Sequence, residues 1–183
     1  MRGKSHHKLG EYLIKRYMPD VPKSCIRAFL IGCVEPDRNP ATYLKGSFRY
    51  QWLRGHNYRN ARRLMRKLSF RLENKESLSW LDYFALGKLI HYTADSFTYA
   101  HNLHFSSDLS KHREYEMALQ EHFLRYLAED PEIDVRLAHN IMEALGHYHR
   151  EYCRQDQSIH TDAKYTVTAC SCVLAILFSK GIL

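Results

Sequence analysis

Residues 77–96, SLSWLDYFALGKLIHYTADS, carry the clearest helical pattern in the chain. Apolar side chains recur there at steps of three or four residues, at Leu78, Leu81, Ala85, Leu89 and Tyr92. Side chains at these steps share one face of an α-helix, so the stretch predicts a long helix that turns an apolar face toward a core. A serine ahead of an apolar run is typical of a helix N-terminus, and we expect Ser77 to open this helix.

The same periodicity predicts helices along nearly the whole chain. We expect them over about residues 9–17, 47–74, 110–129, 131–153 and 158–180, and from about residue 23 to an end near residues 32–36. Pro19 and Pro22 end the first of these, and PDRNPATYLKGS (36–47) is the clearest loop, because its prolines flank polar turn formers. No segment shows strand-like alternation. The sequence therefore predicts an all-α fold, a single-domain bundle of about seven helices over residues 1–183.

Length and composition support a globular chain. The 183 residues suit one domain with one core, and a hydrophobic content of 45% with a charged content of 26% argues against a disordered or fibrous protein. Only eight glycines and five prolines occur, which fits long helices with short connections. The five cysteines are an odd number in a chain too large to need a disulfide framework, so we expect reduced thiols.

Charge and hydropathy bear on partners and location. The formal net charge of +7 favours an anionic partner, such as a phosphodiester or an acidic lipid surface. The first residues, MRGKSHHKLGEYL, contain no hydrophobic signal segment, and no window reaches about 18 uninterrupted apolar residues. We therefore expect a cytoplasmic protein. The apolar segment VTACSCVLAILF (167–178) is interpreted as a core helix too short to span a bilayer, with a membrane-surface helix as the alternative.

Twelve histidines are unusually many, and several have metal-ligand spacing. His91 and Asp95 lie four residues apart on the strongest predicted helix, so both project from one face and could bind one zinc ion at about 2.0–2.2 Å. His101 follows where that helix should end, and His112 and Glu116 repeat the four-residue spacing. Such a pair alone has little weight, because Glu143 and His147 have the same spacing with nothing around them that suggests a site.

HYTADSFTYAH (91–101) followed by HREYE (112–116) resembles the zinc-dependent phospholipase C family, whose relatives include the S1/P1-type nucleases. The hallmark of that family is HxxxDxxxxxH followed shortly by HxxxE. Upstream, GCVEPD supplies Gly32 and Asp37, with Glu35 as the substitute for the aspartate, and RGHNY supplies His56. SHHKLG offers His6 as the early histidine and His7 as its competitor. The resemblance covers about residues 5–116, and the last third of the chain matches only in helical character.

The resemblance implies three zinc sites and a hydrolytic role. It implies one ion held by Asp37, His56, His91 and Asp95, a second held by His101, His112 and Glu116, and a third held by His6 and bridged by Asp95. It also implies that Asp37 is the catalytic residue that takes the proton of the attacking water. Secreted members complete the third site with an N-terminal tryptophan, whereas this chain begins with Met1. The third site is then incomplete, weak, or completed by the amine of Met1, so we expect two or three zinc ions.

These observations predict a zinc-dependent phosphodiester hydrolase, phospholipase C-like, with a multinuclear zinc site that activates water for attack on phosphorus. The substrate would be a phospholipid head group, and a peripheral contact with a membrane is compatible with the charge. One alternative is an S1/P1-type nuclease that acts on nucleic acid, and another is a metal-binding helical protein without turnover. A basic nucleic-acid binder with incidental histidines is a third. No obligate protein partner is evident from the sequence.

Overall fold

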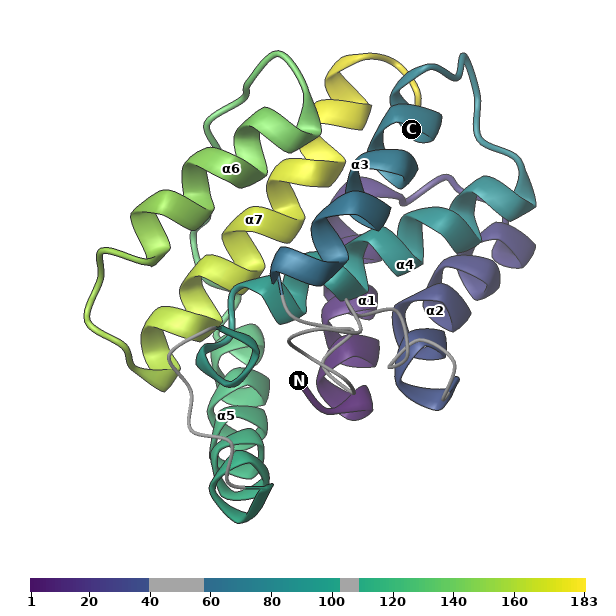
Figure 1. Ribbon diagram of the computed structural model, residues 1–183. Helices are drawn as coiled ribbons and strands as arrows, with labels where there is room; N and C mark the ends of the chain where they lie inside the picture. Colours follow the sequence, from purple (N-terminus) through teal and green to yellow (C-terminus); the bar gives the residue numbers. More distant parts are fainter. Residues whose placement is uncertain (40–57, 103–108) are drawn as a thin grey trace.

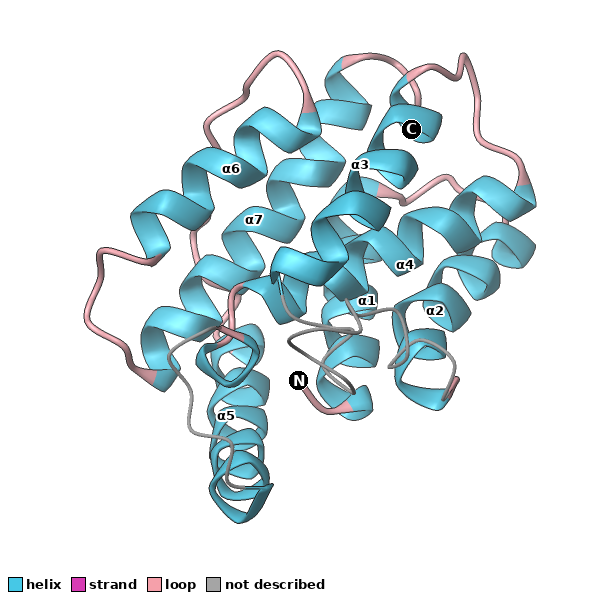
Figure 2. Cartoon of the chain, viewed as in Figure 1, coloured by secondary structure: helices cyan, strands magenta, loops and turns pink. Residues whose placement is uncertain are grey.

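Seven α-helices and one short 3-10 helix make up the described part of a computed structural model of the chain, which covers residues 1–39, 58–102 and 109–183, with only the backbone at residues 109, 110 and 112. The helices are α1 (Gly3–Tyr17), α2 (Lys23–Arg38), α3 (Tyr58–Glu73), α4 (Trp80–Ser96), η2 (Tyr99–His101), α5 (Leu109–Ala128), α6 (Ile141–Tyr152) and α7 (Ile159–Ser179). No strand occurs in these ranges (Figures 1 and 2). The predicted all-α fold of about seven helices is confirmed.

Helix α4 is the central element of the bundle. It contacts α1, α2, α3 and α7 (Figure 1), and from Ala85 to Ser96 nearly all of its side chains are buried. Its first turn is fixed by a capping box, in which the Ser79 hydroxyl accepts the backbone N–H of Asp82 and the Asp82 carboxylate accepts that of Ser79. The helix thus begins two residues later than expected from Ser77. Leu81, which we expected on the apolar face, is 59% exposed, whereas Asp82 and Tyr83 beside it in the first turn are buried.

Two glycines allow α2 and α4 to cross at close range. A Cβ placed on Gly87 of α4 would lie 2.1 Å from the carbonyl oxygen of Phe29 on α2, and one on Gly32 would lie 2.2 Å from the carbonyl oxygen of Phe84. No other amino acid fits either position without separating the helices. The crossing brings the C-terminal end of α2, where Asp37 stands, toward the last turns of α4.

Helix α7 passes behind α4 and alongside α6 (Figure 1). With 21 residues it is long and apolar enough to cross a membrane by length and composition, but 67% of its most apolar window is buried inside the protein. Such burial is typical of the core helix of a globular domain, the role expected for residues 167–178. Cys170 and Cys172 are buried on it, and all five cysteines are free thiols, as expected.

Two predicted boundaries are wrong. Helix α2 continues through Pro36 to Arg38 rather than ending near residues 32–36, because a proline in the last turns removes only one hydrogen bond and Asn39 N–H still bonds Glu35 O at 3.0 Å. The expected helix from Pro131 starts only at Ile141, after the Asn140 side chain caps it. Residues 131–140 form an irregular connection (Figure 2) in which Arg136 N–H donates to the Tyr148 hydroxyl. The predictions for residues 40–57 lie outside the described ranges.

Candidate metal centre

Four metal-type side chains meet where α1, α2 and α4 converge. They are His6 from α1, Asp37 from α2, and His91 and Asp95 from α4. Each offers one ligand atom, and these four atoms all lie within 4.8 Å of one another. His6, His91 and Asp95 have no exposed surface, and the Asp37 side chain is 22% exposed. Three helices that are far apart in sequence therefore build one compact group of imidazole and carboxylate donors.

Each histidine of this group stands at ligand spacing from a carboxylate. The Nε2 atom of His91 lies 3.2 Å from Asp95 Oδ2 and 3.7 Å from Asp37 Oδ1. The Nε2 atom of His6 lies 3.2 Å from Asp95 Oδ1 and 3.9 Å from Asp37 Oδ2. Two ligands of a tetrahedral zinc ion at about 2.0–2.2 Å stand roughly 3.4 Å apart, so each histidine and the carboxylate oxygen beside it are spaced like two ligands that share an ion. The two oxygens of Asp95 face different histidines.

Hydrogen bonds at Nδ1 orient the rings of two histidines so that their Nε2 atoms face Asp95. His91 Nδ1 lies 2.9 Å from the carbonyl oxygen of Cys33, which can only accept, so Nδ1 carries the proton. His101 Nδ1 lies 2.9 Å from the Thr98 hydroxyl, and that hydroxyl donates its own proton to the carbonyl of Asp95. His101 Nδ1 must then be the donor as well. Holding a ligand histidine through its other nitrogen is the usual outer-shell arrangement in metal sites.

His6 is buried without a hydrogen bond on either ring nitrogen from the described residues. Its ring stacks on that of His91 with centroids 3.9 Å apart. Burial and repulsion from His91 lower the pKa of His6 to about 4, so the ring is neutral at pH 7 and offers a lone pair. A buried polar atom without a partner costs free energy, and a bound cation is the partner that its position beside Asp95 suits. The residues present therefore fit a zinc ion.

Neighbouring positive groups favour the ionised form of the Asp95 carboxyl. Burial raises the pKa of this carboxyl, but the Met1 amine, His101 and His91 outweigh burial and hold it well below its usual range. The Met1 amine lies 2.7 Å from Asp95 Oδ1 and 3.2 Å from Glu116 Oε1. Burial lowers the pKa of this amine, but Asp95 and Glu116 raise it to about 10. Burial likewise lowers the pKa of His91, and attraction to Asp95 raises it above its ordinary value.

The members of each alternative pair from the sequence lie in different places. His6 points into the group, whereas the neighbouring His7 is 46% exposed and lies 3.4 Å from Glu11 on the surface of α1. Asp37 lies in the group, whereas Glu35 pairs with Lys88 at 2.9 Å. The separation in each case follows from helix geometry, because adjacent or second-neighbour positions point in different directions.

The remaining candidates lie beside the four-residue group or outside the described residues. His101 Nε2 is 4.0 Å from Asp95 Oδ2, and Glu116 reaches the group through the Met1 amine. His56 lies outside the described ranges, as does the side chain of His112. Glu143 and His147, the pair on α6 with the same spacing, differ from these residues: His147 is 47% exposed and pairs with Glu151 at 3.1 Å.

Sequence reasoning missed two groups that orient the ligands. Thr98, which holds His101, is an ordinary residue in the predicted loop, and its spacing of three residues from His101 is the only signal it gives. The carbonyl of Cys33, which holds His91, is a backbone group that any residue could supply, so no side-chain pattern could reveal it. The contact between the Cys33 carbonyl and His91 exists only because α2 and α4 cross.

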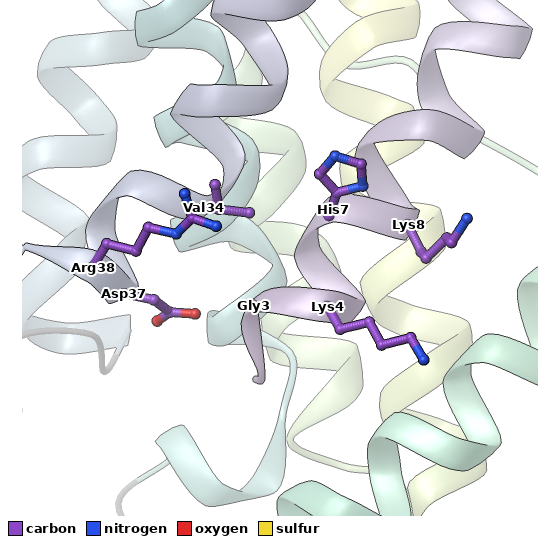
Figure 3. Close-up of a pocket in the computed structure, with 7 residues that line it drawn as sticks. All are labelled: Gly3, Lys4, His7, Lys8, Val34, Asp37 and Arg38. Atoms are coloured by element: carbon purple, nitrogen blue, oxygen red, sulfur yellow. The ribbon is translucent and has the colours of Figure 1, made fainter.

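A cavity of about 360 Å³ opens beside Asp37, between the start of α1 and the end of α2. It is lined by Gly3, Lys4, His7, Lys8, Val34, Asp37 and Arg38. Figure 3 shows the Asp37 carboxylate directed toward the backbone at Gly3, with Arg38 on one side and the two lysines on α1. Asp37 therefore stands between the buried group and a space with basic side chains around it, which is suitable for an anionic substrate.

Comparison with known proteins identifies one family. A family model described as zinc dependent phospholipase C matches residues 5–166. The match extends well past residue 116, where the motif resemblance ends, and includes α6 and the first part of α7. No curated protein and no solved structure matches the chain.

Proposed function

The chain belongs to the zinc-dependent phospholipase C family, and we propose that it is a zinc-dependent hydrolase that cleaves the phosphodiester bond of a phospholipid. The observation that carries the proposal is the position of Asp95. Its buried carboxylate directs one oxygen to His6 and the other to His91, each at 3.2 Å. A carboxylate placed in this way suits a bridge between two metal ions, which a single-ion structural site would not need.

The proposed ligand sets follow the two sides of Asp95. Asp37, His91 and the Oδ2 side of Asp95 would hold one ion, together with His56. His6 and the Oδ1 side of Asp95 would hold another, where the Met1 amine also lies. The remaining ion would be held by His101, His112 and Glu116. Imidazole and carboxylate donors without thiolates are typical of hydrolytic zinc sites.

Zinc bound there would supply charge neutralisation at the phosphate, acidification of a water and stabilisation of the leaving oxygen. The side chains of the protein would place the water, orient the ligands and attract the substrate. Asp37 is the member of the four-residue group that lines the cavity, so its carboxylate is placed to take a proton from a water attacking from that side. His91 and His101 keep their orientation because Cys33 O and the Thr98 hydroxyl hold their Nδ1 atoms. Lys4 and Arg38 would attract the phosphate to the cavity.

The test combines zinc content with turnover. We expect two or three zinc ions per chain by elemental analysis, and hydrolysis of phospholipid vesicles that a chelator abolishes and added zinc restores. Asp95→Asn should lose at least one ion and lower turnover by more than the about 10–100-fold that is typical of losing an outer-shell partner. Normal zinc content and turnover in this variant would refute the assignment.

Glu143→Gln is the matched control. Glu143 shares the four-residue spacing to a histidine but lies exposed in the first turn of α6, so its substitution should change neither zinc content nor turnover. Vesicles with and without acidic phospholipid, together with single-stranded DNA, distinguish the substrates. Zinc-dependent cleavage of the DNA alone would favour a nuclease, and bound zinc without turnover of any substrate would favour a metal-binding protein.

A further inference from the structure

Asp162, in the N-terminal part of α7, is a buried carboxylate that belongs to neither the four-residue group nor the predicted ligand sets. Its side chain has no exposed surface and accepts three hydrogen bonds. The donors are the backbone N–H of Tyr99 at 2.8 Å, the Tyr152 hydroxyl at 2.8 Å and the Tyr115 hydroxyl. They come from η2, α6 and α5, so one carboxylate joins three segments to α7.

Stability alone is a poor explanation for this residue. No cation among the described residues lies within ion-pair distance of Asp162, and its neighbourhood is aromatic, with Phe97 packed against Tyr152 and Tyr165. Moving a carboxylate out of water costs several kcal/mol, and hydrogen bonds offset that cost without a large surplus. A set of apolar side chains in place of the carboxylate and its donors would often be no less stable. What the carboxylate provides is a fixed geometry for its donors.

Two of the three donors are adjacent to proposed metal ligands. Tyr99 begins the single turn of η2 that ends at His101, so fixing the Tyr99 N–H fixes the turn that directs His101. Tyr115 immediately precedes Glu116 on α5. The proposed ligands Asp37, His91 and Asp95 lie instead on α2 and α4, whose close crossing positions them.

We propose that Asp162 is a positioning residue for the metal site formed by His101 and Glu116, and that it sets the distance between η2 and α5. The inference rests on the proposed function, since it assigns these two residues to one ion. Asn at this position keeps the shape but offers one acceptor oxygen and an amide that donates, so it cannot accept from all three groups. The two ligands would then lose their common anchor.

The experiment is a zinc titration of the full-length protein against a chromophoric chelator, which resolves ions of different affinity. Asp162→Asn should weaken one ion by about 10–100-fold, the usual effect of removing an outer-shell partner, and leave the others unchanged. Tyr152→Phe, which removes one of the three donors and keeps the ring, should weaken the same ion by a smaller factor. It also serves as the deciding variant if Asp162→Asn does not fold.

Asp82→Asn is the control for a merely structural effect. Asp82 is also a buried aspartate near a helix N-terminus, 1% exposed and hydrogen-bonded to Ser79 and Arg71. Asp82 lies about 20 Å along α4 from Asp95. The Asp82→Asn substitution should therefore lower the melting temperature without changing any zinc affinity. Unchanged affinities in both Asp162→Asn and Tyr152→Phe would overturn the inference, as would an equal loss in Asp82→Asn. A wild-type chain that binds only one zinc would instead refute the proposed function.

Discussion

The α2–α4 crossing gives the sharpest structural prediction, the effect of Gly87→Ala. A methyl group at residue 87 would lie 2.1 Å from Phe29 O, 2.8 Å from Cys33 N and 2.9 Å from Gly32 C. All three atoms are backbone, so no side-chain rotation can relieve the overlap. Restoring ordinary contact with Phe29 O at 3.4 Å requires the helices to separate by about 1.3 Å.

The magnitude follows from two opposing contributions. Replacing glycine by alanine within a helix stabilises it by up to about 1 kcal/mol, whereas overpacking a core costs about 1–3 kcal/mol and more when backbone must move. We therefore expect a net loss of about 2 kcal/mol, which lowers the melting temperature by about 4–8 °C in a chain of this length. The same movement withdraws Cys33 O from His91 and Asp37 from the metal group, so zinc affinity should fall as well.

The assay is thermal unfolding followed by circular dichroism on chelator-treated protein, with a zinc titration on the same samples. Gly146→Ala is the matched control, because a Cβ on Gly146 of α6 would meet only Arg150 Nη1 at 3.6 Å. That variant should gain up to about 1 kcal/mol and keep its zinc affinity. If Gly87→Ala were as stable as Gly146→Ala and bound zinc equally well, the proposed role of the crossing would be refuted.

Two further predictions concern Thr98 and Asp82. Thr98→Val removes the hydroxyl that holds His101 Nδ1 and should weaken one zinc ion by about 10–100-fold in the chelator titration, whereas Thr98→Ser should keep it; equal affinities would contradict the role of the hydroxyl. Burial raises the pKa of Asp82, but hydrogen bonds from Ser79 and Arg71 outweigh it and hold the pKa below 3.8. The contribution of Asp82 to stability is therefore present above about pH 4 and is lost as the pH falls further. The free energy of unfolding, measured with denaturant, should therefore fall less steeply below about pH 4 in Asp82→Asn than in wild type. An equally steep fall in both proteins would refute this assignment.

Local patterns in the sequence predicted most of the helices and the part of the site that lies on one of them. His91 and Asp95 share a face of α4 because four residues make about one turn, and this holds whatever packs against the helix. The family resemblance placed Asp37 and His6 in the same centre before any geometry was known. Spacing alone could not, because His6, Asp37 and His91 are brought together by contacts between helices that are far apart along the chain.

The errors arose where tertiary contacts override local preference. Residues 131–140 have a helical pattern, yet Arg136 N–H bonds the Tyr148 hydroxyl and Ile133 and Val135 pack against the core, so the segment is held in another conformation. Leu81 fits the apolar face of α4 by spacing, but the first turn buries Asp82 and Tyr83 instead and leaves Leu81 59% exposed. Neither outcome can be read from a single helix, because each depends on what packs against it.

Helix α4 combines the pattern of a core helix with that of the candidate site. Its middle buries Leu86, Leu89 and Ile90, as any core helix would, but its last two turns bury His91 and Asp95. A soluble helix gains nothing from an ionised carboxylate at the centre of a core, since the cost of desolvation is several kcal/mol unless positive charge offsets it. The sequence therefore departs from the pattern that stabilises a core in the very turns where the ligand spacing occurs. Such a departure is typical of functional sites. The Met1 amine at 2.7 Å and the neighbouring histidines supply positive charge that offsets the burial of Asp95, and zinc ions would add to it.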